Sequence, residues 1–204
     1  MDTKVHQDQP ARIGPNAILR VAEALRAGPH ADATAGVFSR AGLAHYLMTP
    51  PQAMVDEREV TALHQALREI IGVKEARQIG ADAGRRTGDY LLANRIPRLA
   101  QLTLKVLPRR LAARVLLKAI ERNAWTFAGS ARFSTQEGPP IRFVLEGSRI
   151  CVGIAESPTP LCDFYAGTFE RLLRKLVDPE VRVIEVQCEA TGRTSCVFEV
   201  RSDA

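Results

Sequence analysis

The sequence predicts an α+β fold, and three observations lead to that prediction. Over about the first 130 of the 204 residues, apolar side chains recur at the spacing of an amphipathic helix. After Asn123 this period gives way to short apolar runs separated by Gly and Pro, a pattern typical of strands and turns. No internal repeat or linker divides the chain, whose length suits one domain. We therefore expect a flexible N-terminus, residues 1–14, and a single α+β domain, residues 15–204.

Breakers and capping residues delimit six helices in the first part of the sequence. Pro15 stands at a favoured first helical position, and Gly28 ends the helix that follows. Asp56 is suited to cap the third helix, and Pro97 and Pro108 each precede one of the last two. The predicted helices cover residues 15–28, 36–48, 56–72, 73–93, 98–107 and 109–122.

Three glycines lie on one side of the helix predicted over residues 73–93. Gly80, Gly84 and Gly88 recur at a spacing of four, although glycine costs about 1 kcal/mol relative to alanine inside a helix. Such a surface indicates close contact with another backbone or with a ligand. Tight packing against a second helix is the favoured interpretation, and contact with a flat ligand is the alternative.

The second part of the sequence predicts a meander, one helix and a terminal hairpin. Aromatic and β-branched residues begin the strand series around Trp125, Phe127 and Phe133. Turn signals at residues 138–140 and 146–148 separate this region from strands over residues 141–145 and 150–154. A helix is expected over residues 161–177. The last strands cover residues 181–188 and 195–200, joined by a turn that contains Gly192.

The net charge of +5 is concentrated in one segment. Residues 98–132 carry eight Lys or Arg against the single acidic residue Glu121. Such a segment attracts anions, and we consider an anionic membrane surface, an acidic partner enzyme and a plain solvated helix face. With only three Tyr and one Trp, a nucleic-acid partner is not expected. The predicted basic stripe is Lys105, Arg109, Arg114, Lys118 and Arg122, and the predicted buried side is Leu102, Val106, Leu111, Val115, Leu116 and Ile120.

The N-terminal sequence predicts the cellular compartment. Residues 1–12 are polar, and no stretch of the chain approaches the roughly 18 apolar residues of a membrane span. We expect a cytoplasmic protein, with peripheral attachment at the inner face of the membrane as the alternative. In a reducing compartment, the four Cys are interpreted as thiols or metal ligands rather than disulfides.

Three of these cysteines and one carboxylate form a candidate zinc site. Cys188 and Cys196 lie on the two sides of the terminal hairpin, Glu185 precedes Cys188 by three residues, and Cys162 opens the preceding helix. Three thiolates and a carboxylate suit a closed, structural zinc site. The alternative is that these cysteines are small buried apolar residues. Cys151 is predicted to be a plain buried strand residue.

The C-terminal motif resembles the 4-vinyl reductase domain family, which is related to the sensor domains of phenol-responsive activators and to a vesicle-tethering subunit family. The resemblance lies in residues 162–167, 185–188 and 196–198. In the sensor domains, a Cys, a Glu 23 residues later, a Cys three further on and another eight beyond ligate zinc. The resemblance therefore implies a structural zinc ion on Cys162, Glu185, Cys188 and Cys196, which stand at that spacing.

Two further stretches, residues 87–97 and 124–129, are similar to the bacteriochlorophyll-synthesis branch of this family. The resemblance implies an apolar ligand cavity between the helices and the sheet. It also implies a role in reducing the 8-vinyl group of a divinyl (proto)chlorophyllide-type tetrapyrrole. We expect His45 or His64 to ligate the magnesium of such a ligand, with a core or surface histidine as the alternative in each case. The candidate ligand-binding residues are Gly84, Arg85, Gly88, Trp125 and Phe127.

The sequence leaves the catalytic step open. Vinyl reduction needs a cofactor or another electron source, and no nucleotide, flavin or common iron–sulfur motif is visible. The favoured hypothesis is a substrate carrier or accessory protein that binds the tetrapyrrole. The alternatives are the 8-vinyl reductase itself with an external reductant, and a small-molecule sensor or interaction module. Pigment-synthesis enzymes are expected partners, and a homodimer is a further alternative.

Overall fold

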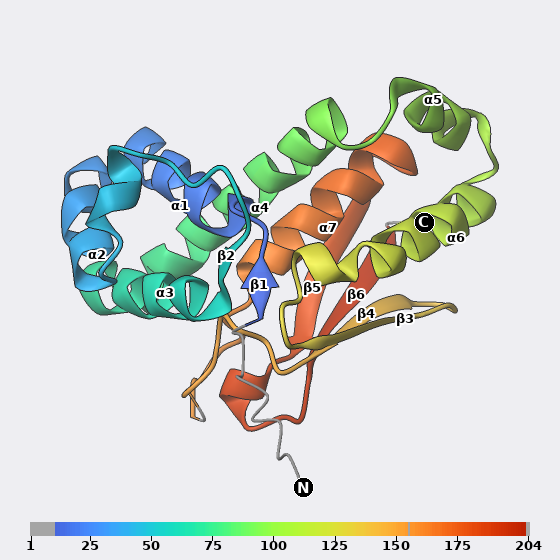
Figure 1. Ribbon diagram of the computed structural model, residues 1–204. Coiled ribbons are helices and arrows are strands. Elements are labelled where there is room, and N and C mark those ends of the chain that lie inside the picture. Colours follow the sequence, from blue (N-terminus) through green and yellow to red (C-terminus); the bar gives the residue numbers. More distant parts are fainter. Residues whose placement is uncertain (1–10, 155, 203–204) are drawn as a thin grey trace, which may run out of the picture.

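The computed structural model describes residues 11–154 and 156–202, and Figure 1 shows their arrangement. The first elements form a helical group that the long helix α4 connects to the rest of the domain. Two short strands, β1 and β2, pair antiparallel beside this group. In chain order these elements are β1 (Arg12–Ile13), α1 (Asn16–Ala27), η1 (Ala31–Ala33), α2 (Thr34–Arg40), η2 (Ala44–Leu47), β2 (Val55–Asp56), α3 (Glu57–Ile71) and α4 (Val73–Asn94).

The C-terminal half contains a helical hairpin, α5–α6, and a four-stranded antiparallel sheet in the order β3-β4-β6-β5. Helix α7 packs on this sheet and α4 packs on α7. The α+β prediction is therefore confirmed. The elements are α5 (Arg98–Val106), α6 (Arg109–Arg122), η3 (Ala124–Thr126), β3 (Arg132–Gln136), β4 (Ile141–Glu146), α7 (Asp163–Leu176), β5 (Val181–Gln187), η4 (Glu189–Thr191) and β6 (Cys196–Ser202).

Aromatic side chains fill the space between α7 and the sheet. Phe169 of α7 stacks on Phe143 of β4 with ring centroids 4.3 Å apart, and it also meets Phe198 of β6 at 5.8 Å. Phe127 and Phe133 complete this cluster. The expected apolar cavity between helices and sheet is therefore not at this position, because side chains occupy it. The hollows found lie elsewhere: a cavity of about 10 Å³ among α3, α4 and α7, and an open depression of about 330 Å³ between α1 and α4.

Helices α4 and α7 approach so closely that their backbones touch. A Cβ atom at Gly84 would overlap the backbone oxygen of Phe164, and one at Gly88 would lie 2.7 Å from the Cβ of Arg171. From the other side, a Cβ at Gly167 would lie 2.5 Å from the backbone oxygen of Ala81. The glycine series therefore serves helix packing. The alternative of a flat ligand at Gly84 and Gly88 is wrong, because α7 fills that space.

Several predicted boundaries differ from the structure. The helix expected over residues 36–48 is interrupted at Gly42, whose φ of 74° ends α2 before η2 begins. Trp125 lies in the 3-10 helix η3 rather than in a strand, and residues 150–154 form no strand. Arg12 and Ile13 pair with β2, so the expected flexible N-terminus is wrong at these two residues; residues 1–10 of that prediction lie outside the described chain.

The hairpin α5–α6 buries less of its apolar surface than its periodicity predicts. Leu116 and Ile120 are buried as expected. Leu104 is the one buried side chain of α5, because this helix touches its neighbours along a narrow contact. The prediction is wrong for the side chains that the described structure leaves exposed, which are Leu102 (60%), Val106 (81%), Leu111 (46%) and Val115 (45%).

Candidate metal centre

Four cysteine thiols from separate elements meet at the end of the sheet. Cys151 lies in the loop after β4, Cys162 immediately precedes α7, Cys188 follows β5 and Cys196 begins β6. All four are buried, and their sulfur atoms lie within 4.8 Å of one another. The Sγ of Cys196 is 3.6 Å from that of Cys162, 3.8 Å from that of Cys188 and 3.9 Å from that of Cys151. Sulfur ligands about 2.3 Å from a tetrahedral zinc ion lie roughly 3.8 Å apart. The cluster therefore has the size and the donors of a closed zinc site.

The local backbone explains why the hairpin brings two of these thiols together. Cys188 remains extended at the end of β5, and η4 then turns the chain, with Gly192 in the left-handed region at φ 77°. The Thr191 hydroxyl donates to the carbonyl of Cys188 at 2.8 Å and tightens this turn. Cys196 enters the sheet opposite Leu145 of β4. The hairpin turn thus returns Cys196 next to Cys188.

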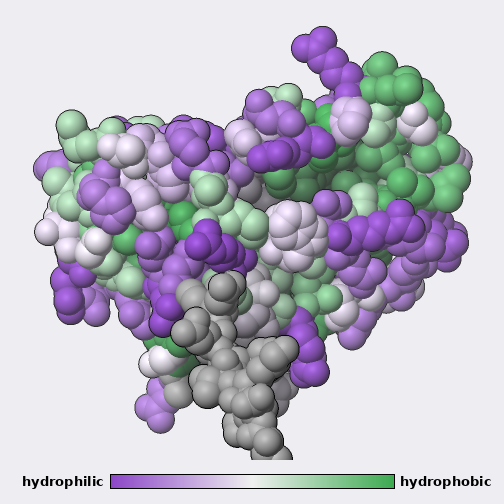
Figure 2. All heavy atoms as spheres, viewed as in Figure 1, coloured by the Kyte–Doolittle hydropathy of each residue, from purple (hydrophilic) through white to green (hydrophobic). Residues whose placement is uncertain are grey.

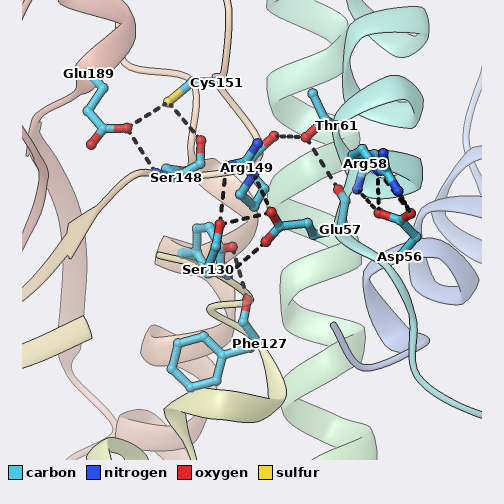
Figure 3. Close-up of polar contacts among 11 residues, drawn as sticks. Asp56, Glu57, Arg58, Thr61, Phe127, Ser130, Ser148, Arg149, Cys151 and Glu189 are labelled. Carbon is cyan, nitrogen blue, oxygen red and sulfur yellow. Dashed lines mark hydrogen bonds and ion pairs between the residues drawn. The ribbon is translucent and has the colours of Figure 1, made fainter. Parts of the chain in front are cut away.

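Cys151 is buried, as the sequence predicts, but it lies in a loop and its sulfur belongs to the cluster. Figure 3 shows its thiol beside Ser148 and Glu189. The Glu189 carboxylate accepts hydrogen bonds from the backbone N–H groups of Gly147 (2.5 Å) and Ser148 (2.9 Å). The Ser148 hydroxyl in turn lies 3.2 Å from the Sγ of Cys162. These contacts fix the loop that carries Cys151, so the structure adds this residue to the candidate ligands. The even number of four cysteines in one chain was the sequence signal for it.

Glu185, the fourth predicted ligand, lies next to the cluster and plays a visible second part. Its Oε2 accepts a hydrogen bond from the backbone N–H of Cys162 at 2.8 Å, while its Oε1 is buried and has no hydrogen-bond partner among the described residues. Burial raises the pKa of Glu185 to about 9, and burial also raises the pKa of the Cys162 thiol. The structure therefore offers two donor sets, four thiols or three thiols with Glu185, and the four thiols are the more compact.

A buried basic group lies beside the thiols. The small cavity between α3, α4 and α7 is lined by His64, Arg68, Arg77 and Phe164, among others. The thiols of Cys162 and Cys151 act electrostatically on Arg68, although burial is the main cause and lowers its pKa. A guanidinium at this place offsets negative charge that thiolates carry.

The structure does not bring the predicted tetrapyrrole residues together. Arg85 is exposed and pairs with Asp82 at 3.3 Å, whereas Trp125 is 63% exposed on η3. Phe127 belongs to the aromatic cluster on α7. Of the two candidate magnesium ligands, His64 is buried within the helices and His45 is exposed on η2. Gly84 and Gly88 are covered by α7, as described above.

A second polar cluster joins the helical group to the sheet (Figure 3). The buried Glu57 at the start of α3 accepts hydrogen bonds from the backbone N–H of Ser130 (2.7 Å) and from its hydroxyl (2.8 Å). Arg149 approaches the same carboxylate at 3.6 Å. Both oxygens of this carboxylate have a partner inside the domain, so its geometry is that of a structural clamp.

Comparison with known proteins defines the class and then the family. Residues 141–202, from β4 through α7 to β6, match the 4-vinyl reductase domain, so the fold and the cysteine motif are those of a protein with this domain. The chain is 42% identical over 189 residues to the bacteriochlorophyll synthase 23 kDa chain of Cereibacter sphaeroides, covering 93% of this chain and 90% of that protein. It is 39% identical over 192 residues to the protein of the same name from Rhodobacter capsulatus, covering 94% and 88%. The chain belongs to this family of bacteriochlorophyll synthase 23 kDa chains, which confirms the resemblance found in the sequence.

The fold is shared more widely. An H-NOX protein from K. algicida, in a crystal structure of a mutant in the Fe(II) unliganded state, superimposes with a TM-score of 0.57 at 11% sequence identity. The match covers 94% of this chain and 97% of that one. At this identity the likeness shows a common fold. Among the described helices, none combines the length and hydropathy needed to cross a membrane.

Proposed function

We propose that this protein acts in bacteriochlorophyll biosynthesis, where it binds a divinyl (proto)chlorophyllide-type tetrapyrrole and supports reduction of its 8-vinyl group. The observation that carries this proposal is the identity of about two residues in five, over nearly the whole chain, with bacteriochlorophyll synthase 23 kDa chains. The printed name of those relatives also supports pigment-synthesis enzymes as partners. We place the protein in the cytoplasm, at the inner face of the membrane.

A carrier or accessory role accounts best for the chemistry of the chain. The sequence contains no visible motif for a nucleotide, flavin or common iron–sulfur centre. The cysteine cluster supports a closed structural site, because four protein ligands leave no coordination position for a substrate. The alternative, a reductase that uses an external electron donor, is a matter for turnover measurements.

Titration of the purified protein with divinyl protochlorophyllide tests the proposal. We expect a saturable shift of the pigment absorbance with no loss of the vinyl group when NADPH is added. Turnover with NADPH would establish the reductase instead, and a failure of the pigment to bind would overturn both. The single indole, Trp125, reports the location of the ligand. Quenching of its emission supports binding near η3, and unchanged emission places the bound pigment elsewhere on the domain.

We further propose that the cluster holds one structural zinc ion on Cys151, Cys162, Cys188 and Cys196. This choice differs from the sequence prediction in one ligand, Cys151 in place of Glu185. The sulfur distances support it, as does the hydrogen bond that engages Glu185 with the backbone of Cys162. Zinc at this place would tie the loop after β4 and the start of α7 to the terminal hairpin, which makes metal binding part of folding.

A further inference from the structure

The short helix α5 carries an apolar stripe that the described part of the chain leaves uncovered. Leu99, Leu102 and Val106 recur three and four residues apart, which places them on one side of the helix, and they are 76%, 60% and 81% exposed. We call these three residues the α5 apolar face. Figure 2 shows hydrophobic side chains gathered over α5, at the upper right of the molecule. Large apolar side chains gathered on an outer surface mark an interaction site rather than a core.

Basic residues border this face, and acidic residues are missing from the sequence around it. Residues 90–120 contain seven Lys or Arg and no Asp or Glu. Figure 2 shows a hydrophilic band over α6, directly below the apolar surface of α5. Arg109 pairs with Asp178 at 2.9 Å and Arg114 with Glu137 at 2.8 Å. The exposed cations that form no ion pair with any described residue include Lys105, Arg110 and Lys118.

We propose that the α5 apolar face docks the protein on an anionic lipid bilayer, with Lys105, Arg110 and Lys118 at the level of the lipid phosphates. Apolar side chains of an interfacial helix enter the boundary between headgroups and acyl chains, and flanking cations add electrostatic attraction. A single short stripe with a few cations gives weak, reversible attachment. The inference deepens the proposed location at the membrane, and it does not depend on tetrapyrrole binding.

Charge distinguishes the bilayer from a second copy of this chain. In a symmetric dimer the same patch faces itself. Such a dimer through α5 would bring the cations of one copy against those of the other, with no acidic residue between 90 and 120 to pair with them. An anionic bilayer supplies the missing negative charge to every one of these cations at once.

Co-sedimentation with vesicles tests the proposal, using the full chain without pigment. We expect binding to vesicles that contain phosphatidylglycerol, weak binding to pure phosphatidylcholine, and loss of most binding at high salt. The variant Leu99→Ser/Leu102→Ser/Val106→Ser should lower the partition coefficient on anionic vesicles at least tenfold. These side chains are exposed, so the variant should fold, which circular dichroism verifies.

Two matched controls separate the site from general surface properties. Lys105→Gln/Arg110→Gln/Lys118→Gln should also lower the partition coefficient about tenfold, whereas Lys74→Gln/Arg182→Gln/Arg193→Gln removes the same charge from other exposed positions and should change it less than threefold. Met48→Ser removes an apolar side chain that is 87% exposed elsewhere and should have no effect.

Three results would overturn the proposal. They are absence of binding to anionic vesicles, equal loss in both charge variants, and undiminished vesicle binding of the α5 variant. A change in oligomeric state of that variant, with vesicle binding retained, would assign the α5 apolar face to a second copy. Because no pigment is present, none of these results bears on tetrapyrrole binding.

Discussion

Gly84 of α4 lies directly against the backbone carbonyl of Phe164 in α7, with no space between them for a side chain. The Thr168 hydroxyl, one turn further along α7, donates to the carbonyl of Gly84 at 3.1 Å and fixes the two helices at this crossing. Because Phe164 follows Cys162 by two residues, this contact also sets the position of the cysteine cluster relative to the helical group. The glycine is thus the point at which two parts of the domain are held together.

Replacement of Gly84 by Ala should destabilise the protein by about 2–4 kcal/mol, because the added methyl group forces the helices apart. Gly80→Ala is the matched control on the same helix, since its Cβ would meet the backbone N of Phe164 at an ordinary 3.7 Å. That variant should be neutral or more stable by up to about 1 kcal/mol. Urea denaturation measures both. Equal effects of the two variants would contradict the close contact at Gly84.

Cys151→Ser should lower both the zinc content and the melting temperature, because metal binding is coupled to folding. Cys188→Ser should do the same, since both donor sets include it. Glu185→Gln keeps the size of the side chain and an oxygen that accepts from the backbone of Cys162, so it should retain zinc at one ion per chain. Metal analysis of protein prepared without chelator provides the measurement.

The converse pattern, zinc lost from Glu185→Gln and kept by Cys151→Ser, would assign the fourth ligand to Glu185. Cobalt substitution gives an independent readout, because thiolate-to-cobalt charge-transfer absorbance increases with the number of thiolate ligands. Wild-type protein that contains no zinc would rule out the metal proposal altogether.

Glu57→Gln should cost about 2–3 kcal/mol of stability, since the buried carboxylate accepts two hydrogen bonds from Ser130 and faces Arg149. The amide that replaces it cannot offset the charge of Arg149. Glu69→Gln is the control, because the Glu69–Arg40 pair is more than half exposed at both side chains and should change stability by less than about 0.5 kcal/mol. Similar losses in the two variants would show that the Glu57 cluster is no structural clamp.

His64 should make the protein acid-sensitive in a defined range. Burial lowers the pKa of His64 to about 3, below its ordinary value of 6.5, and its Nε2 has no hydrogen-bond partner among the described residues. As the pH falls below about 6.5, the unfolded chain binds a proton that the folded chain excludes, so stability is lost between pH 6.5 and 3. Above pH 6.5 the histidine is neutral in both states and contributes nothing to the pH dependence.

His64→Leu removes this titration. We expect its stability relative to wild type to rise by about 2 kcal/mol between pH 7.5 and pH 5. Denaturant unfolding of both proteins at the two pH values gives this difference, in which acid effects on other groups cancel. Parallel pH profiles would mean that His64 is hydrated or partnered in the folded state.

The sequence by itself determined the order of helices and strands and the closeness of α4 to a second helix. Periodicity, prolines and capping residues are local signals, and the cap is confirmed at Asp56, whose side chain accepts from the N–H of Arg58 at 2.8 Å. The spacing of Gly80, Gly84 and Gly88 had one physical cause in the fold, and packing against a helix was the favoured interpretation. The C-terminal motif was specific enough to indicate the family, which the relatives confirm.

Only the tertiary structure decided which side chains share a site and which stay exposed. Cys151 joins the other thiols through a loop fixed by Glu189, 38 residues away along the chain, and no local pattern encodes such a contact. A helical period shows that α5 has an apolar side but not whether a neighbour covers it, so Leu102 and Val106 were misassigned to the core. Periodicity depends on neighbours along the chain, whereas burial and ligand sets depend on how distant segments meet in space.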